Sequence, residues 1–258
     1  MPKGGLARRV TWVKQELAAA QGPVVVVDAG SSLLGEYVAL QSEGRVLVEG
    51  MNLAHYDAMV VGRMDVLLGF DVLRERAAEA SFAVLSANIV DPDTQEPLFE
   101  PYVIIERGGV TIGIVGISDQ DVASMPETRS GAVYLDAVET TRRYVSELRD
   151  QVDVLMVLSR LGKADNVALA AQVPGINVIV GGKTRRLTQE PEREGDTLIT
   201  EMSYNGERCG KLTVFVGADG APYDYVQQVI ALTEDWPDDP EAAQMLAAYR
   251  ERYPEPAQ

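Results

Sequence analysis

Short apolar runs alternate with helix-like patterns along the first two-thirds of the chain. Leu6, Val10, Val13 and Leu17 are spaced to lie on one face of a helix. The continuous apolar run Val24–Val27 follows, and such a run before a glycine-containing turn predicts a buried strand. A helix followed by a buried strand is typical of an α/β domain.

The same alternation continues through residue 180. We predict further strands at 58–61, 82–85, 102–106, 110–117, 154–158 and 178–180. Helices are predicted between them at 66–80, 137–152 and 164–172. Gly108 and Gly109 join two of these strands as a hairpin. From Leu198 onward the pattern contains strands, at 198–202, 212–216 and 225–232.

The end of the chain has the pattern of a separate helix. Asp239 is a favourable N-cap, and Pro240 suits the first helical position. The apolar stripe of this helix consists of Met245, Leu246, Tyr249 and Tyr253. We expect the stripe to pack back on the domain, and a helix that docks on a partner is the alternative. The sequence therefore predicts one α/β domain at 1–236 with a C-terminal helix, 237–258, packed on it.

Composition excludes several classes of partner. With 258 residues and 46% hydrophobic content, the chain can build one sizeable core. A net charge of −16 repels nucleic acid and anionic lipid, so we expect an acidic soluble protein with neither as a general partner. No apolar run approaches the ~20 residues of a membrane span. The first nine residues carry charges without an apolar segment behind them, so no signal peptide is predicted.

The single cysteine and the single histidine restrict the chemistry further. Cys209 alone can form neither an internal disulfide nor a CxxC metal site. His55 alone cannot build a histidine-rich zinc or di-iron centre, although a carboxylate site for Mg²⁺ or Ca²⁺ is compatible with the composition. We interpret His55 as a surface residue at a helix end and Cys209 as a small buried residue without an activated thiol.

Seven short segments stand at the ends of the predicted elements, in a fixed order. They are GGLARR at 4–9, VDAG at 27–30, MNLAHYDA at 51–58, LSANI at 85–89, GIVGI at 113–117, LSRLG at 158–162 and IVGGKTR at 179–185. Together they resemble the motifs of the 5′-nucleotidase/UDP-sugar hydrolase family, whose catalytic domain is a calcineurin-like metallophosphoesterase. The resemblance implies an α/β fold of the metallo-dependent phosphatase type, a four-layer α-β-β-α sandwich of mixed sheets flanked by helices. It also implies that Asn52 and Asn88 satisfy backbone groups in turns.

Hydrolysis in this family requires two divalent cations, bridged by an aspartate and a water that attacks the phosphate. The positions that the resemblance assigns to metal ligands, or to the histidine beside them, are Ser31, Arg63, Met64, Arg160, Lys183 and Arg185. The family's first motif, DxHG, would precede Gly4 and has no counterpart in this sequence. Arginine and lysine have no lone pair to offer a metal, and methionine is too soft for Mg²⁺ or Mn²⁺. We therefore expect a catalytically degenerate domain, a pseudoenzyme without a metal cofactor.

Four of these positions now carry a positive charge, namely Arg63, Arg160, Lys183 and Arg185. If they converge, they supply a total charge similar to that of two metal ions, and the planar fork of arginine suits phosphate, sulfate or carboxylate. The first alternative is that Asp28, Asp65 and Asp119 pair with them and close the site with structural salt bridges. The second alternative is that the cations are simply solvated on a rim.

Three functional classes follow from these observations. The favoured one is a non-catalytic binding or interaction module, for which a phosphate-like or other small anion is one candidate ligand. The second is a residual 5′-nucleotidase or other phosphoester hydrolase with a rearranged carboxylate site. The third is a structural subunit whose C-terminal helix contacts a protein partner. The resemblance links the chain to nucleotide metabolism and implies a periplasmic or extracellular setting, whereas ligand, partner and pathway are not specified by the sequence.

Overall fold

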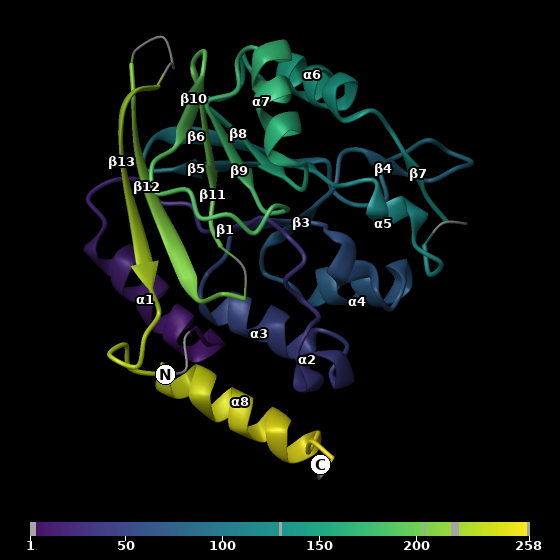
Figure 1. Cartoon of the computed structure of the whole chain (residues 1–258), viewed down its shortest axis with the longest axis vertical. Coiled ribbons are helices and arrows are strands. Elements are labelled where there is room, and N and C mark those ends of the chain that lie inside the picture. The colour runs from purple at the N-terminus through teal and green to yellow at the C-terminus, as the bar shows by residue number, and fades with distance from the viewer. Residues whose placement is uncertain (1–3, 129–130, 204, 218–221, 257–258) are drawn as a thin grey trace.

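The computed structural model describes residues 4–128, 131–203, 205–217 and 222–256, and it contains two facing sheets between layers of helices (Figure 1). The strand order of the larger sheet is β10 (Glu192–Glu194), β11 (Thr197–Glu201), β9 (Val178–Gly181), β8 (Val154–Ser159), β6 (Val110–Ile117) and β5 (Tyr102–Arg107). The central strands are parallel, while β5 and β10 are antiparallel to their neighbours. The sheet is therefore mixed, as the family resemblance implies.

The smaller sheet contains three parallel strands, β1 (Val27–Asp28), β2 (Ala58–Val60) and β3 (Ala83–Leu85). Two further pairs of strands are antiparallel, β12 (Arg208–Val216) with β13 (Pro222–Ala231) and β4 (Ile89–Val90) with β7 (Val133–Tyr134). The side chain of Gln227 ties the β12–β13 pair to the larger sheet, because it contacts Thr200 at 2.7 Å and the Thr188 carbonyl at 2.5 Å.

Helices cover the outer face of each sheet. Those on the side of the smaller sheet are α1 (Leu6–Ala19), α3 (Arg45–Leu53), α4 (Phe70–Glu79) and α8 (Pro240–Arg252). Those on the larger sheet are α6 (Ala137–Leu148) and α7 (Lys163–Gln172). The short elements α2 (Tyr37–Gln41), the 3₁₀-helix η1 (Arg63–Val66) and α5 (Asp121–Ser124) lie in connections.

Three clusters of buried apolar side chains fill the spaces between these four layers. One joins α1, α3, α4 and α8 to the smaller sheet, and another joins α6 and α7 to the larger sheet. The third lies between the two sheets and includes Val60, Ile114 and Leu158, all fully buried. The expected four-layer α-β-β-α sandwich is therefore confirmed.

Most of the predicted elements agree with the structure, but the first strand differs. The run Val24–Val27 was expected to be a buried strand, but only Val27 lies in β1 and all four valines are partly exposed. The reason is that β1 is an edge strand of its three-stranded sheet, so it has a neighbouring strand, β2, on one side only in that sheet. Helix α3, with Val46, Val48 and Met51 buried, was not predicted.

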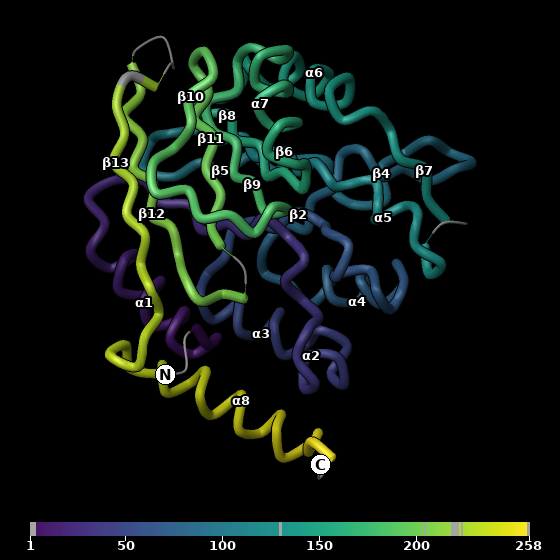
Figure 2. Tube along the Cα trace, in the orientation of Figure 1, coloured from purple at the N-terminus to yellow at the C-terminus, as the bar shows by residue number. Residues whose placement is uncertain are grey.

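The C-terminal helix α8 packs against α1 and α3. The Asp239 carboxylate accepts hydrogen bonds from the amides of Glu241 and Ala242, as expected for an N-cap. The Tyr249 hydroxyl donates to Glu49 at 2.6 Å. The described start of the chain lies beside the start of this helix (Figure 2), since the Asp239 amide donates to the Ala7 carbonyl. Met1 to Lys3 are part of the first nine residues, for which no signal peptide is predicted, and they lie outside the described residues.

No helix in the described ranges is long and apolar enough to cross a bilayer.

Candidate functional site

The carboxyl ends of the parallel strands from both sheets lead into five connections that meet at one edge of the sandwich. We call this the strand-end site. It is built from residues 28–33 after β1, 61–65 after β2, 118–119 after β6, 160–162 after β8 and 182–185 after β9. Ligands of α/β proteins bind outside the carboxyl ends of such strands, so this edge is the candidate functional site.

Asp65 holds two of these connections together. It is 4% exposed. One carboxylate oxygen accepts hydrogen bonds from the amides of Ser31 and Gly62, and the other accepts from Ser32 and Leu33, at 2.7–2.9 Å. Burial raises the pKa of Asp65 to about 6, against the opposing effect of these amides. Asp65 therefore binds backbone instead of pairing with Arg63, which is exposed on η1.

Ser31 and Asp28 form the turn that follows β1. Ser31 has a left-handed backbone with φ of 62°, and its hydroxyl accepts a weak hydrogen bond from the Met64 amide at 3.4 Å. One oxygen of Asp28 accepts from the Gly30 amide at 2.8 Å and from the Ser32 hydroxyl at 2.5 Å. The side chains of this turn are thus engaged in shaping the turn itself.

Arg160 is the central side chain of the strand-end site. The residue is 8% exposed. Its Nη1 donates to the carbonyl oxygens of Ala29 and Gly30 at 3.1 and 3.2 Å, and to that of Gly182. Its Nε lies 3.7 Å from the Asp119 carboxylate. One guanidinium therefore joins the connections after β1, β6, β8 and β9.

Glycines make room for this guanidinium. A Cβ built at Gly62 would lie 2.9 Å from Arg160 Nε, and one at Gly182 would lie 2.9 Å from Nη1 and 2.4 Å from the Ala29 carbonyl oxygen. Real Cβ atoms do not approach neighbours so closely, so the arginine packs on bare backbone at both positions.

Asp119 and Arg160 are a buried ion pair with incomplete hydrogen bonding. Asp119 is 2% exposed, and burial raises the pKa of its carboxyl above the ordinary value, while the charges of Lys183 and Arg160 oppose the rise. Asp119 Oδ1 and Arg160 Nε are both buried without a hydrogen-bond partner among the described residues. The expectation of a structural salt bridge thus agrees with the geometry at Arg160.

The other three predicted cations lie at the surface. Lys183 has a side chain that is 39% exposed, with Nζ 3.9 Å from Asp121. Arg63 and Arg185 are also exposed, and Arg185 has a left-handed φ of 60°. The structure therefore separates the four predicted cations into one that is buried and three that are solvated.

Sequence reasoning missed the carboxylate that holds the loop after β9. Glu201, at the end of β11, is 6% exposed. Its oxygens accept hydrogen bonds from the Thr184 amide at 2.5 Å and the Thr184 hydroxyl at 2.6 Å. These residues are brought together because β11 lies beside β9, and no local pattern around Glu201 indicates that neighbour.

The two asparagines act as expected. The side chain of Asn88 exchanges hydrogen bonds with the amide and carbonyl of Ser118, at 2.9 and 3.0 Å. Asn52 accepts from the amide of Ser81 and donates to the carbonyl of Glu79. Both satisfy backbone groups in turns, which confirms the prediction.

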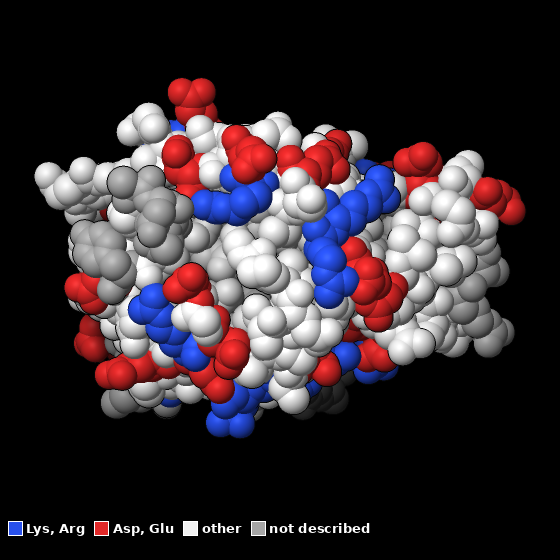
Figure 3. Space-filling view, turned by 90° about the horizontal axis from the view of Figure 1, so that it is seen from above, with Lys and Arg blue, Asp and Glu red and all other residues white. Residues whose placement is uncertain are grey.

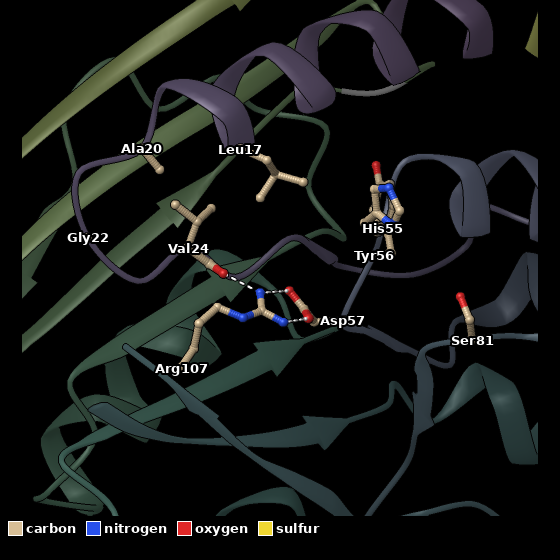
Figure 4. A pocket seen from close by; sticks show the side chains of 9 residues that line it. All are labelled: Leu17, Ala20, Gly22, Val24, His55, Tyr56, Asp57, Ser81 and Arg107. Atoms are coloured by element: carbon tan, nitrogen blue, oxygen red, sulfur yellow. Dashed lines mark hydrogen bonds and ion pairs between the residues drawn. The ribbon is translucent and has the colours of Figure 1, made fainter. Parts of the chain in front are cut away.

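His55 lies at the lip of a cavity of about 530 Å³ near the opposite ends of the strands (Figure 4). It is exposed just beyond the end of α3, as predicted. Arg107 crosses the cavity floor to Asp57, with hydrogen bonds of 2.7 and 3.1 Å, and also donates to the Val24 carbonyl. Asp57 in turn accepts from the Val26 amide at 2.7 Å, so this ion pair anchors the chain that enters β1.

Cys209 is partly buried and unpaired, and burial raises the pKa of its thiol to about 11. A thiol with that pKa is protonated at neutral pH, which agrees with the prediction of an unactivated cysteine.

Comparison with known proteins supports the family that the motifs resemble. No protein-family model matches the chain. The 5′-nucleotidase of Vibrio cholerae is 29% identical over 225 residues, which cover 80% of this chain and 40% of that protein. A probable 5′-nucleotidase of Treponema pallidum is 32% identical over 190 residues, covering 71% of this chain and 32% of that protein. The chain thus spans well under half the length of these curated relatives.

Solved structures of similar proteins superimpose on nearly the whole chain. The sulfate thiohydrolase SoxB of Thermus thermophilus superimposes with a TM-score of 0.91 at 26% identity, over 98% of this chain and 47% of that one. A 5′-nucleotidase precursor from the same organism gives a TM-score of 0.89 at 29% identity, over 97% of this chain and 54% of that one. The chain belongs to the 5′-nucleotidase family of calcineurin-like phosphoesterases.

Among the residues that the structure describes, no three His, Cys, Asp or Glu side chains lie together in a way that could hold a metal ion. The carboxylates at the strand-end site already accept other hydrogen bonds or face a cation: Asp28 and Asp65 bind the turns, and Asp119 faces Arg160.

Proposed function

We propose that this domain is a non-catalytic relative of the 5′-nucleotidases, which binds a ligand or a partner without cleaving a phosphoester. The position of the Arg160 guanidinium carries this proposal. It lies among the carbonyl oxygens of Ala29, Gly30 and Gly182, at the strand ends where the resemblance assigns the metals. A divalent cation there would meet a fixed positive charge in a buried setting, where Coulomb repulsion is strong.

The side chains at the assigned ligand positions support the same conclusion. These positions are Ser31, Arg63, Met64, Arg160, Lys183 and Arg185. Three of them are arginine and one is lysine, which have no lone pair for a metal at neutral pH. Methionine is a soft ligand unsuited to Mg²⁺ or Mn²⁺, and a single serine hydroxyl cannot replace a bridging carboxylate.

Binding of an anion is the function that remains best supported by the charges. Arg63 and Lys183 are exposed, and each follows a glycine that packs against the Arg160 guanidinium. The rest of the surface is acidic overall, with a net charge of −16 for the chain. On the face shown in Figure 3, carboxylates and cationic side chains are interspersed.

The alternative, a residual hydrolase with a rearranged carboxylate site, has less support. Such a site needs carboxylates that converge on a metal. Both oxygens of Asp65 and one oxygen of Asp28 accept hydrogen bonds within the turns. Asp119 faces the guanidinium of Arg160, and Glu201 accepts from Thr184.

Metal content and turnover, measured together, test the proposal. The protein is treated with EDTA, dialysed against Mn²⁺, Mg²⁺, Zn²⁺ or Co²⁺, and assayed for bound metal by mass spectrometry and for hydrolysis of 5′-AMP and a generic aryl phosphate ester. We expect substoichiometric metal and no turnover above the metal-only blank, with the Vibrio cholerae 5′-nucleotidase as the positive control. Two tightly bound ions together with metal-dependent release of phosphate would show that the family chemistry is intact.

A further inference from the structure

Strand β1 has the sequence of a central strand but the position of an edge strand. A continuous apolar run such as Val24–Val27 is typical of a strand in a parallel sheet that is covered on both faces. In the described part of the chain, however, β1 is hydrogen-bonded to β2 alone, and all four valines stay partly exposed. The run is therefore less buried than its composition predicts.

The β12–β13 pair lies in the same layer as β1 and forms a sheet of its own. On the outer face of the pair, Lys211 Nζ lies 2.5 Å from the Glu16 carboxylate of α1. On its inner face, Gln227 contacts Thr200 of the larger sheet at 2.7 Å. The valines before and within β1 are bracketed in the same way, because they pack alternately on the cluster that includes α1 and on the cluster between the sheets.

Strand β12 is the member of this pair that is nearer β1. In Figure 1 it lies between β13 and the body of the sandwich. Burial raises the pKa of the Cys209 thiol, and the charge of Arg9 opposes this rise while that of Asp28 adds to it. Since Cys209 is near the start of β12 and Asp28 ends β1, these two ends are close together. The two strands are thus neighbours in one layer without pairing.

The free edge of β1 is defined by its pleat. Val26 turns both of its backbone groups toward β2, because its amide donates to the Asp57 carboxylate and its carbonyl accepts from the Asp57 amide, each at 2.7 Å. Successive residues of a strand direct these groups to opposite sides. The amides and carbonyls of Val25 and Val27 therefore point away from β2, toward the side on which β1 has no neighbouring strand among the described residues.

The free edge of β12 follows from the same rule. The Glu207 carbonyl, just before β12, accepts a hydrogen bond from the Leu232 amide, just after β13. The alternate residues Gly210 and Leu212 consequently direct their amides and carbonyls away from β13. Leu212 is also partly exposed, like the valines of β1.

We propose that the edges of β1 and β12 together bind one extended strand of a separate polypeptide, which completes a continuous sheet from β3 to β13. The partner is a strand because extended backbone can hydrogen-bond to an edge on either side. It is apolar on both faces, since the layers that cover β1 and β12 would cover it as well, and it contains no proline at the paired positions. Every strand in the described ranges already pairs in a sheet, so we assign the partner segment to another chain. This surface uses none of the cations of the strand-end site, and its test is independent of the proposed function.

Titration with a synthetic strand tests the proposal. The probe is fluorescein-labelled Lys-Val-Ile-Val-Ile-Val-Lys-amide, followed by fluorescence anisotropy, and the control peptide has proline in place of the central valine. We expect saturable binding of the probe, and roughly tenfold or more weaker binding of the control, because proline cannot donate to either edge. Both peptides carry the same charge, so attraction to the acidic chain is matched. Absence of binding, or equal binding of the two peptides, would overturn the proposal.

Hydrogen exchange of single amides, measured by NMR, gives a second readout with an alternating pattern. In the free protein, the amides of Val25 and Leu212 should exchange faster than those of Val26 and Thr213, which are turned toward existing partners. Saturating probe should slow the exchange of Val25 and Leu212 and leave the other two nearly unchanged. Equal slowing of all four amides, or of none, would contradict docking between the two edges.

A matched pair of variants tests the position of the probe on the hairpin. Leu212→Asp places a charge beside the docked strand and should weaken probe binding roughly tenfold or more. Val226→Asp is the control, because Val226 is 49% exposed on the outer face of the same hairpin and should leave binding unchanged. Equal effects of the two variants would refute the assignment, and the exchange pattern of the unmodified protein tests it without any substitution.

Light scattering of the protein without probe tests the source of the strand. We expect a monomer in which the amides of Val25 and Leu212 exchange rapidly. A dimer in which both amides are already protected would assign the two edges to a second copy of this chain and would overturn the proposal of a separate partner.

Discussion

At the scale of single residues, Arg160 acts as an internal cross-link between connections that follow different strands. A guanidinium has several donors in one plane, so it can satisfy carbonyl oxygens from different connections at once. Here those connections follow β1, β8 and β9, and the positive charge also faces Asp119. Because the pair is buried, loss of one partner leaves an uncompensated charge in a poorly solvated place.

Arg160→Ala is therefore expected to lower the free energy of unfolding by about 3–5 kcal/mol, the usual cost of breaking a buried pair. Urea denaturation followed by fluorescence measures the change. Arg160→Lys keeps the charge without the planar fork. Its free energy of unfolding should lie between those of the unmodified protein and the Arg160→Ala variant. Arg142→Ala, at an exposed arginine on α6, should change stability by less than about 0.5 kcal/mol. A loss below about 1 kcal/mol for Arg160→Ala would contradict the cross-linking role.

At the scale of elements, the strand ends are shaped by buried carboxylates that bind backbone. Asp65 holds the turn after β1 to the turn after β2, and Glu201 holds the loop after β9. Helix α8 is attached differently, through its partly buried face and the hydrogen bond from Tyr249 to Glu49. The loops at the site are thus fixed by several polar contacts. Helix α8 combines packing against α1 and α3 with polar contacts at its start, where Lys14 lies 2.9 Å from the Asp239 carboxylate.

Deletion of α8 tests whether this helix is an internal support or a contact for a partner. A chain that ends before Pro237 should unfold at lower urea, with a loss of about 2 kcal/mol, because several apolar side chains of α8 return to water. Tyr249→Phe removes only the hydroxyl and should cost about 1 kcal/mol. Light scattering measures the molecular mass in parallel. An unchanged mass supports an internal role, whereas loss of an assembly seen for the longer chain would favour the structural-subunit alternative.

At the scale of the whole molecule, excess negative charge opposes the compact state. The chain carries 39 acidic and 23 basic residues. Many exposed cations are already paired, for example Lys211 with Glu16 and Lys163 with Glu192. The unpaired excess is therefore mainly acidic and repels itself on folding.

Added sodium chloride should accordingly raise the melting temperature. The Debye length falls from about 30 Å at 0.01 M to about 10 Å at 0.1 M salt, which screens the repulsion between distant carboxylates. We expect a rise of about 2 °C over that range, measured by differential scanning calorimetry. The same series at mildly acidic pH, where part of the carboxylates are protonated, should give a smaller rise. A melting temperature that falls with salt would mean that attractive surface pairs outweigh the repulsion.

The sequence by itself determined the fold class and the residue types that stand at the strand ends. Apolar runs and helical spacing define most of the elements because burial imposes a period on each of them. The ordered motifs indicate the family, and the positive charge of position 160 is evident without coordinates. The edge position of Val24–Val27 was not, since the number of neighbours of a strand depends on pairing with distant segments.

Only the tertiary structure decided which cations are buried and which are exposed. Arg160 and Lys183 are both positively charged, but Arg160 lies among carbonyl oxygens, whereas the side chain of Lys183 is 39% exposed. Likewise, the sequence around Glu201 does not indicate its contact with Thr184. That contact joins the end of β11 to the loop after the neighbouring strand β9. The burial and the hydrogen-bond partners of a side chain depend on segments that are distant in the sequence. They are therefore known only once the fold has brought those segments together.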